Sequence, residues 1–119
     1  MPVNILQIHG TKDTTIKYDG DHIGKYDYPG AEATTKMWAA YNGCSTKPIS
    51  PTKTLDLERH IDGNETKITR YAGNGHGGDV ELWTIEGGSH IPLISDSFSR
   101  EVIEWLYAHP KGGATPGTD

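Results

Sequence analysis

The sequence predicts an α/β fold in which a sheet is accompanied by a β-hairpin and two main helices. Two short apolar runs, residues 3–8 and 80–85, each lead into a glycine-containing segment, as is typical of strands with both faces covered. Two longer segments, 31–42 and 98–109, carry apolar residues at spacings of three and four. This periodicity predicts helices, the second of them amphipathic, and strands buried on both faces are typical of parallel sheets.

The first half of the chain contains a strand, a loop and a helix. We expect residues 3–8 to form a central strand, because the run is apolar at nearly every position. Residues 10–30 are rich in Thr, Asp, Gly and Tyr, which predicts a long surface loop. The helix at 31–42 is expected to end at Gly43, since glycine readily adopts the left-handed conformation that closes helices.

The second half of the chain contains a predicted hairpin and another buried strand. In residues 55–61, Leu55, Leu57, Arg59 and Ile61 alternate with acidic residues and a histidine, residues 66–72 alternate in part, and Asp62-Gly63 between them is a turn signal. Residues 73–78 form a glycine-rich connector, and the strand at 80–85 follows it. This strand is apolar on both faces, so we expect it to be buried within the sheet.

The last helix is predicted to pack against the sheet through one face. That face contains Phe98, Val102, Trp105, Leu106 and His109. Either Ser95 or Ser97 is suitable as its N-cap, and Pro110 stands just past its end.

Composition limits the classes of function. We expect residues 1–110 to form one domain and residues 111–119 to form a flexible tail. The formal net charge is −5 with no run of Lys or Arg, which argues against nucleic acid as a partner. No apolar stretch is long enough for a membrane span, and the first residues lack the pattern of an export signal, so localisation stays open.

Two segments that directly follow buried strands carry the chemistry. Asp13 lies in the segment after the strand at 3–8, and His90 lies in the segment after the strand at 80–85. In open α/β sheets, sites form beyond the carboxyl ends of the strands. A carboxylate that binds one nitrogen of an imidazole fixes its tautomer, leaving the other nitrogen to accept a proton. We therefore expect Asp13 and His90 to act as an acid and base pair.

Four phrases carry a resemblance to a known family. They are LQIHGTKD (residues 6–13), YDG (18–20), WAAYNGC (38–44) and VELWTIEGGSH (80–90). In order and approximate spacing, they resemble the closing third of secreted α/β-hydrolases of the polyhydroxybutyrate-depolymerase and feruloyl-esterase type. The resemblance implies a truncated α/β-hydrolase-like sheet. It also implies that Asp13 is the acid of the catalytic triad and that His90 is its base.

The chain departs from this family at the nucleophile. No G-x-S-x-G elbow is present, and Ser89 in the nearest phrase directly precedes the presumed base, which makes it a poor nucleophile. The family elements that carry the elbow and the oxyanion hole are also missing ahead of residue 3. Members of the family often pair a second cysteine with the one after the helix, whereas Cys44 is the only cysteine here. We expect Cys44 to be a free thiol.

These observations leave three hypotheses for function. The first is hydrolysis of a carboxylic ester or lactone, in which His90 is the general base, Asp13 orients it, and water or a serine of another chain attacks. The second is an inactive binding or assembly module that forms a homodimer, or joins a complementing chain, through an exposed edge of the strand at 3–8. The third is a calcium-assisted hydrolase whose ligands would come from the acidic loop, with Asp19 and Asp21 as candidates.

Several other side chains have simpler interpretations. Trp38, Trp83 and Trp105 are predicted to be core residues because they stand in periodic apolar patterns. His22, His60 and His76 lack the spacing of a zinc site and are expected at the surface.

Overall fold

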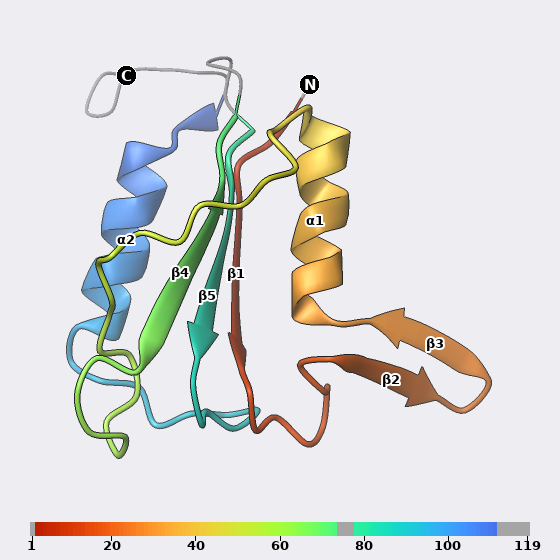
Figure 1. The fold of residues 1–119 in the computed structure, drawn as a ribbon. Coiled ribbons are helices and arrows are strands. Elements are labelled where there is room, and N and C mark those ends of the chain that lie inside the picture. The colour runs from red at the N-terminus through yellow and green to blue at the C-terminus, as the bar shows by residue number, and fades with distance from the viewer. Residues whose placement is uncertain (1, 74–77, 112–119) are drawn as a thin grey trace.

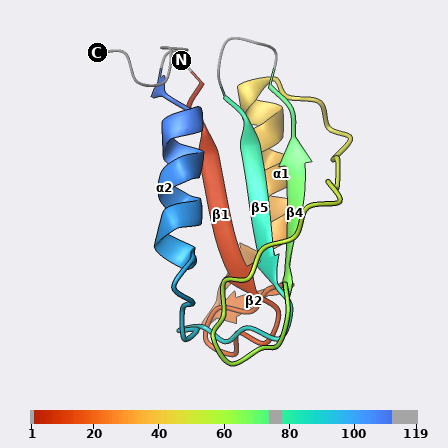
Figure 2. The ribbon, with the colours of Figure 1, turned by 90° about the vertical axis from the view of Figure 1, so that its left-hand side faces the viewer.

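A three-stranded sheet between two helices forms the body of the molecule, as the computed structural model shows for residues 2–73 and 78–111 (Figure 1). The strand order is β1 (Ile5–Gly10), β5 (Val80–Ile85), β4 (Thr66–Tyr71). Helix α1 (Ala31–Asn42) covers one face of the sheet and α2 (Phe98–Ala108) covers the other (Figures 1 and 2). The predicted α/β class is confirmed, as a mixed sheet.

Strand β5 is the centre of the sheet, and β1 lies at its edge. β1 pairs with β5 in parallel, whereas β4 pairs with β5 in the antiparallel direction. All six residues of β5 are buried. The prediction of a central strand at residues 3–8 is therefore wrong for the described chain. The physical reason is that an apolar run indicates two covered faces and carries no information about hydrogen bonding at the two edges of the strand.

Helix α1 has the bounds predicted from its periodicity. It ends at Gly43, whose φ of 72° is the left-handed conformation that glycine tolerates best. The N–H of Gly43 bonds the carbonyl oxygen of Ala40, and the N–H of Cys44 bonds that of Ala39. The termination signal in the sequence is thus confirmed together with the helix.

Helix α2 is confirmed in position but differs in its cap and its face. It begins after Ser97, and neither serine caps it by a side-chain hydrogen bond, because the hydroxyls of Ser95 and Ser97 both donate to the carbonyl oxygen of Asp56. Trp105 is buried as predicted, whereas Leu106 is 56% exposed. The contact face is therefore narrower than the sequence predicted.

The loop predicted at residues 10–30 contains a hairpin. Strands β2 (Gly20–Ile23) and β3 (Tyr26–Pro29) pair in antiparallel register. Most of their side chains are exposed, and four of their eight residues are Gly, Asp or Pro. Such a composition favours turns over strands, which is why the sequence pattern predicted a loop.

The hairpin predicted at residues 55–61 and 66–72 forms only in its second arm, as β4. The first arm makes only isolated bridges, one of them from Leu55 to Thr66. The carboxylate of Glu65 accepts the backbone N–H groups of Leu57 at 3.2 Å and Glu58 at 2.5 Å. Because a side chain takes these donors, the backbone of Leu57 and Glu58 cannot form a regular ladder with β4.

The core occupies both faces of the sheet. Its larger cluster contains Leu55, Leu57, Ile68, Trp83, Ile85 and Trp105. Trp38 departs from its prediction, since 38% of this residue is exposed. Parts of the connector and the tail predicted at 73–78 and 111–119 lie outside the described residues, as does His76.

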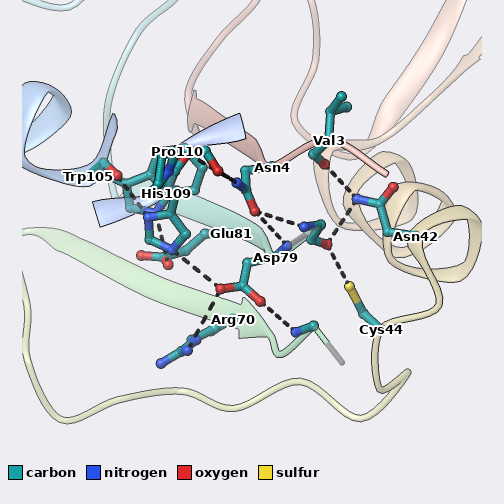
Figure 3. Close-up of polar contacts among 12 residues, drawn as sticks. Val3, Asn4, Asn42, Cys44, Arg70, Asp79, Glu81, Trp105, His109 and Pro110 are labelled. Atoms are coloured by element: carbon teal, nitrogen blue, oxygen red, sulfur yellow. Dashed lines mark hydrogen bonds and ion pairs between the residues drawn. The ribbon is translucent and has the colours of Figure 1, made fainter. Parts of the chain in front are cut away.

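A polar cluster joins distant segments at the amino ends of β1 and β5 (Figure 3). Asn4 donates to the carbonyl oxygen of His109 at 3.0 Å and accepts the N–H groups of Gly78 and Asp79, both at 2.9 Å. His109 in turn lies 3.4 Å from the carboxylate of Asp79. The Cys44 thiol donates to the carbonyl oxygen of Gly78 at 2.9 Å, so it also belongs to this end of the sheet.

Candidate active site

The candidate site lies at the opposite end, beyond the carboxyl ends of β1 and β5. Since these strands are parallel neighbours, the segments that follow them emerge side by side. Backbone contacts hold them together: the N–H of Thr11 bonds the oxygen of Ile85 at 3.0 Å, and that of Lys12 bonds the oxygen of Gly88 at 2.9 Å. The N–H of Gly87 donates to the hydroxyl of Thr11 at 2.7 Å. Asp13 and His90 therefore project from two joined loops.

Gly10 permits this close approach of the two loops. A Cβ atom added at Gly10 would lie 2.2 Å from the carbonyl oxygen of Gly88, far inside the contact limit. The glycine is required here because the backbone of the second loop occupies the space of a side chain. Packing thus explains why a glycine, Gly10, stands at the second position of the H-G phrase.

Asp13 and His90 form a direct hydrogen bond. Nδ1 of His90 lies 2.8 Å from Oδ2 of Asp13. Asp13 is buried, whereas the side chain of His90 is 43% exposed. An ionised carboxylate can only accept, so Nδ1 carries the proton, and Nε2 of the neutral ring is an unprotonated acceptor. The two residues that the sequence singled out are brought together, while their catalytic role stays a prediction.

The loop after β1 stabilises the ionised form of Asp13. Oδ1 accepts the backbone N–H of Thr15 at 2.9 Å and that of Ile16 at 2.8 Å. Burial by itself raises the pKa of Asp13, but the hydrogen bonds from His90, Ile16 and Thr15 outweigh it, so the pKa lies below its ordinary value. Asp13 is therefore a carboxylate at neutral pH, as an orienting acid requires.

A second histidine contacts the same carboxylate. Nε2 of His9 lies 3.2 Å from Oδ2 of Asp13 and 2.7 Å from the carbonyl oxygen of Ile16. The ring of Tyr18 meets that of His9 edge to face, with centroids 5.5 Å apart. Sequence reasoning missed this role of His9. Its position in the H-G-T-x-D phrase, four residues before the acid, was the available signal.

A cleft of about 320 Å³ adjoins the pair. Its lining combines apolar and polar side chains: Ile8, His9, Gly10, Asp13, Ile16, Ile85, Ser89, His90, Pro92 and Phe98. Ser89 is exposed next to His90 in the chain. In the part of the chain that the structure describes, no serine hydroxyl is hydrogen-bonded to the His90 ring. The geometry thus offers a base and an acid at a cleft, without an activated serine among these residues.

The calcium hypothesis is not supported by the acidic loop. Asp21 binds Lys17 at 2.9 Å and His22 at 3.0 Å, and Asp19 is exposed. The ion pair with Lys17 lowers the pKa of Asp21. Within residues 2–73 and 78–111, no group of three or more His, Cys, Asp or Glu side chains is arranged to hold a metal ion. Asp19 and Asp21 thus belong to no such group among these residues.

Cys44 is a free, buried thiol far from the candidate site. Burial raises its pKa, and the neighbouring charge of Asp79 raises it further. A thiol in this state is a poor nucleophile. His22 and His60 are exposed, in agreement with their surface assignment.

Comparisons of the chain with protein-family models, with curated proteins and with solved structures find no match. Among the described residues, no helix combines the length and the apolarity that crossing a membrane requires. The site must therefore be interpreted from its own geometry.

Proposed function

We propose that this chain carries the base and the orienting acid of a hydrolase acting on carboxylic esters or lactones. The observation that carries the proposal is the 2.8 Å contact between Nδ1 of His90 and the buried Asp13 carboxylate at a cleft. The low pKa of Asp13 supports it, because an ionised acid holds His90 in the tautomer that leaves Nε2 free to accept a proton. The half-exposed position of His90 gives substrate and water access to this nitrogen.

In the proposed reaction, His90 first accepts a proton from the attacking group and later donates a proton to the leaving alcohol. His90 Nε2 removes a proton from the attacking water or serine hydroxyl while the oxygen forms a bond to the ester carbonyl carbon. The tetrahedral intermediate then collapses, the bond to the alcohol oxygen breaks, and the proton passes from His90 to the leaving alcohol. Asp13 stays ionised and stabilises the positive charge on His90 in between. When the attacking group is water, the products are the acid and the alcohol. When it is a serine of another chain, a second round with water releases the acid.

A screen of p-nitrophenyl esters and aliphatic lactones tests this proposal. General-base assistance contributes about 10²- to 10⁴-fold, so His90→Ala is expected to lose at least about 100-fold in turnover. His22→Ala is the matched control, because His22 is another exposed histidine beside an aspartate, Asp21, on the β2–β3 hairpin. Its turnover should equal that of the wild type. Equal rates for His90→Ala and the wild type would contradict the proposal.

A fluorophosphonate probe distinguishes the two attacking groups. We expect the pure chain not to be labelled, because no serine is activated by His90 within the described residues. Labelling that is lost in Ser89→Ala would show instead that Ser89 is the nucleophile. This result would overturn the assignment of water or a serine of another chain.

We propose, as a second candidate function, that the chain assembles with a complementing strand at the free edge of β1. Ile5 and Thr11 direct their N–H groups to Asp79 and Ile85 on the β5 side. Because bonding alternates along a parallel strand, the backbone groups of residues 6 and 8 point away from β5. Groups that no described residue pairs with favour addition of another strand.

The two helices present apolar flanks on the β1 side. In α1, Glu32 and Lys36 line a cavity with Thr69 of β4, whereas Met37 and Trp38 line one with Val3. In α2, Glu101 and Glu104 line a cavity with Ile68 of β4. The exposed apolar side chains of this helix lie on its other side and are Ile103, Leu106 and Tyr107. The uncharged flanks and the open edge together fit a strand with apolar side chains on both faces.

Helix α2 favours a separate strand over a second copy as the occupant. Figure 2 shows α2 displaced beyond β1, over the position that the next strand would take. A second copy paired antiparallel through β1 would bring its own α2 toward the same space. A single added strand would lie beneath α2 without this conflict.

Hydrogen exchange tests the second candidate with a peptide of residues 79–86 as the probe, since this sequence already pairs with β1 on its other side. The amides of Leu6 and Ile8 should exchange quickly in the free chain and slow on adding the peptide, but not on adding its scrambled version. Slow exchange that depends on the concentration of the chain itself would identify a second copy instead. Absence of any protection would contradict docking at this edge.

A further inference from the structure

We propose that His9 is a positioning residue that locks the Asp13 carboxylate in the orientation in which it holds His90. The expected effect on turnover rests on the proposed hydrolase function, whereas the positioning role itself rests on the contacts of His9. His9 Nε2 lies 2.7 Å from the oxygen of Ile16 and 3.2 Å from Oδ2 of Asp13. No role is assigned to His9 in proton transfer to or from substrate.

The tautomer of His9 follows from its shorter contact. A carbonyl oxygen is only an acceptor, so Nε2 of His9 must carry a hydrogen. This N–H donates its hydrogen bond to the Ile16 oxygen, and the same nitrogen contacts the Asp13 carboxylate at 3.2 Å. His9 thereby contacts both ends of the turn at residues 13–16, namely the side-chain carboxylate of Asp13 and the backbone carbonyl oxygen of Ile16.

The contacts around Asp13 divide evenly between the two carboxylate oxygens. Oδ1 accepts the backbone N–H groups of Thr15 and Ile16. Oδ2 faces the imidazole nitrogens of His90 and His9. With donors on both oxygens, rotation of the carboxylate would break contacts on each side. His9 is the less exposed member of the pair on Oδ2, with 13% side-chain exposure, and the exposed His90 is the member left to face substrate.

His9 is itself supported from β5. The Tyr18 ring packs edge to face on the His9 ring, and the Tyr18 hydroxyl lies 2.8 Å from the hydroxyl of Thr84. Burial raises the pKa of Tyr18, so its hydroxyl stays protonated at neutral pH. Thr84 precedes the loop that carries His90, and the support therefore links both strands of the site.

Two substitutions separate the two properties of the His9 side chain. His9→Phe keeps a ring against Tyr18 but removes the N–H, whereas His9→Gln places an amide N–H near the position of Nε2 and loses the ring. We expect His9→Phe to lower kcat at least about 10-fold with a smaller change in KM, because the substitution misaligns the base and keeps the other residues that line the cleft. His9→Gln should restore kcat to within about threefold of the wild type.

A spectroscopic readout tests the positioning without turnover. In ¹⁵N spectra, His90 should be protonated at Nδ1 in the wild type and in His9→Gln, and should shift toward the Nε2-protonated tautomer in His9→Phe. An unchanged His90 tautomer in His9→Phe would overturn the proposal. An equal loss of kcat in His9→Phe and His9→Gln would also overturn it, because the His9 ring would then have a purely structural role. If no ester or lactone is hydrolysed by any variant, the hydrolase function fails, while the ¹⁵N measurement still decides the role of His9.

Discussion

Replacing Asp13 by Asn is the sharpest perturbation of the site. The carboxylate accepts three hydrogen bonds, two on Oδ1 and one on Oδ2, and Oδ2 also contacts His9 Nε2 at 3.2 Å; an amide has a single oxygen to replace them. In the better orientation, the amide oxygen keeps the N–H groups of Thr15 and Ile16, and the amide NH₂ then opposes the imidazole N–H of His90. Since bonds to a charged group contribute about 1.5–3 kcal/mol each and exposed His90 can bind water instead, we expect Asp13→Asn to lower the free energy of unfolding by about 2–4 kcal/mol.

The loss should depend on pH in a direction set by Asp13. Its pKa in the folded chain lies below the ordinary value of 3.8, so the folded state binds this proton less tightly than the unfolded state. The stabilisation is thus complete well above pH 3.8 and disappears as the pH falls through the lowered pKa. The difference between wild type and Asp13→Asn should be constant above about pH 5 and shrink in more acidic solution.

Urea unfolding followed by fluorescence of the buried Trp83 and Trp105 measures this difference between pH 3 and pH 8. Asp19→Asn is the control, because this exposed aspartate of the same loop should change stability by less than about 0.5 kcal/mol. Turnover should fall by about 10³- to 10⁴-fold in Asp13→Asn, because the amide favours the wrong His90 tautomer. If the free energies of unfolding of the wild type and Asp13→Asn were equal at pH 7, or if their difference did not change with pH, the assigned hydrogen-bonding scheme would be refuted.

Three further substitutions or probes test the structure around the site. Gly10→Ala should cost about 1–3 kcal/mol in urea unfolding, because its Cβ would meet the Gly88 oxygen; unchanged stability would exclude this close approach. Glu81→Gln should cost a similar amount and alter the near-ultraviolet circular dichroism, because the carboxylate accepts two buried indole N–H groups. The Cys44 thiol, buried with a raised pKa, should react with a thiol reagent at least about 100-fold faster in urea than in the native state; equal rates would contradict its burial.

Periodic apolar patterns predicted the elements whose stability comes from burial. Apolar residues at spacings of three and four predicted the bounds of α1 and the position of α2, because each helix packs through one face. A short apolar run predicted β5, because both faces of this strand are buried. The β2–β3 hairpin could not be predicted this way, because its strands bury little and contain turn-forming residues. The first arm of the predicted hairpin failed because Glu65 binds its backbone donors, a tertiary contact that alternation does not encode.

The candidate site was predictable in its two principal residues and not in its support. Asp13 and His90 follow strands whose parallel pairing brings them to one end of the sheet, so their proximity could be inferred from order and phrase. The contact of His9 with Asp13 depends on the turn at 13–16 folding back over the end of β1. The H-G-T-x-D phrase places His9 four residues before the acid, but it does not specify the turn that brings the two side chains together.

The free edge of β1 and the candidate site belong to one geometric problem. Asp13 follows the carboxyl end of β1, and within residues 2–73 and 78–111 β1 has a partner strand on one side only. A complementing strand added parallel to β1 would also end beside Asp13 and the cleft, so the segment after it would be within reach of His90. The two proposals thus make a joint prediction: a partner that protects the Leu6 and Ile8 amides should also change turnover. A partner that protects these amides without affecting turnover would separate assembly from catalysis in this chain.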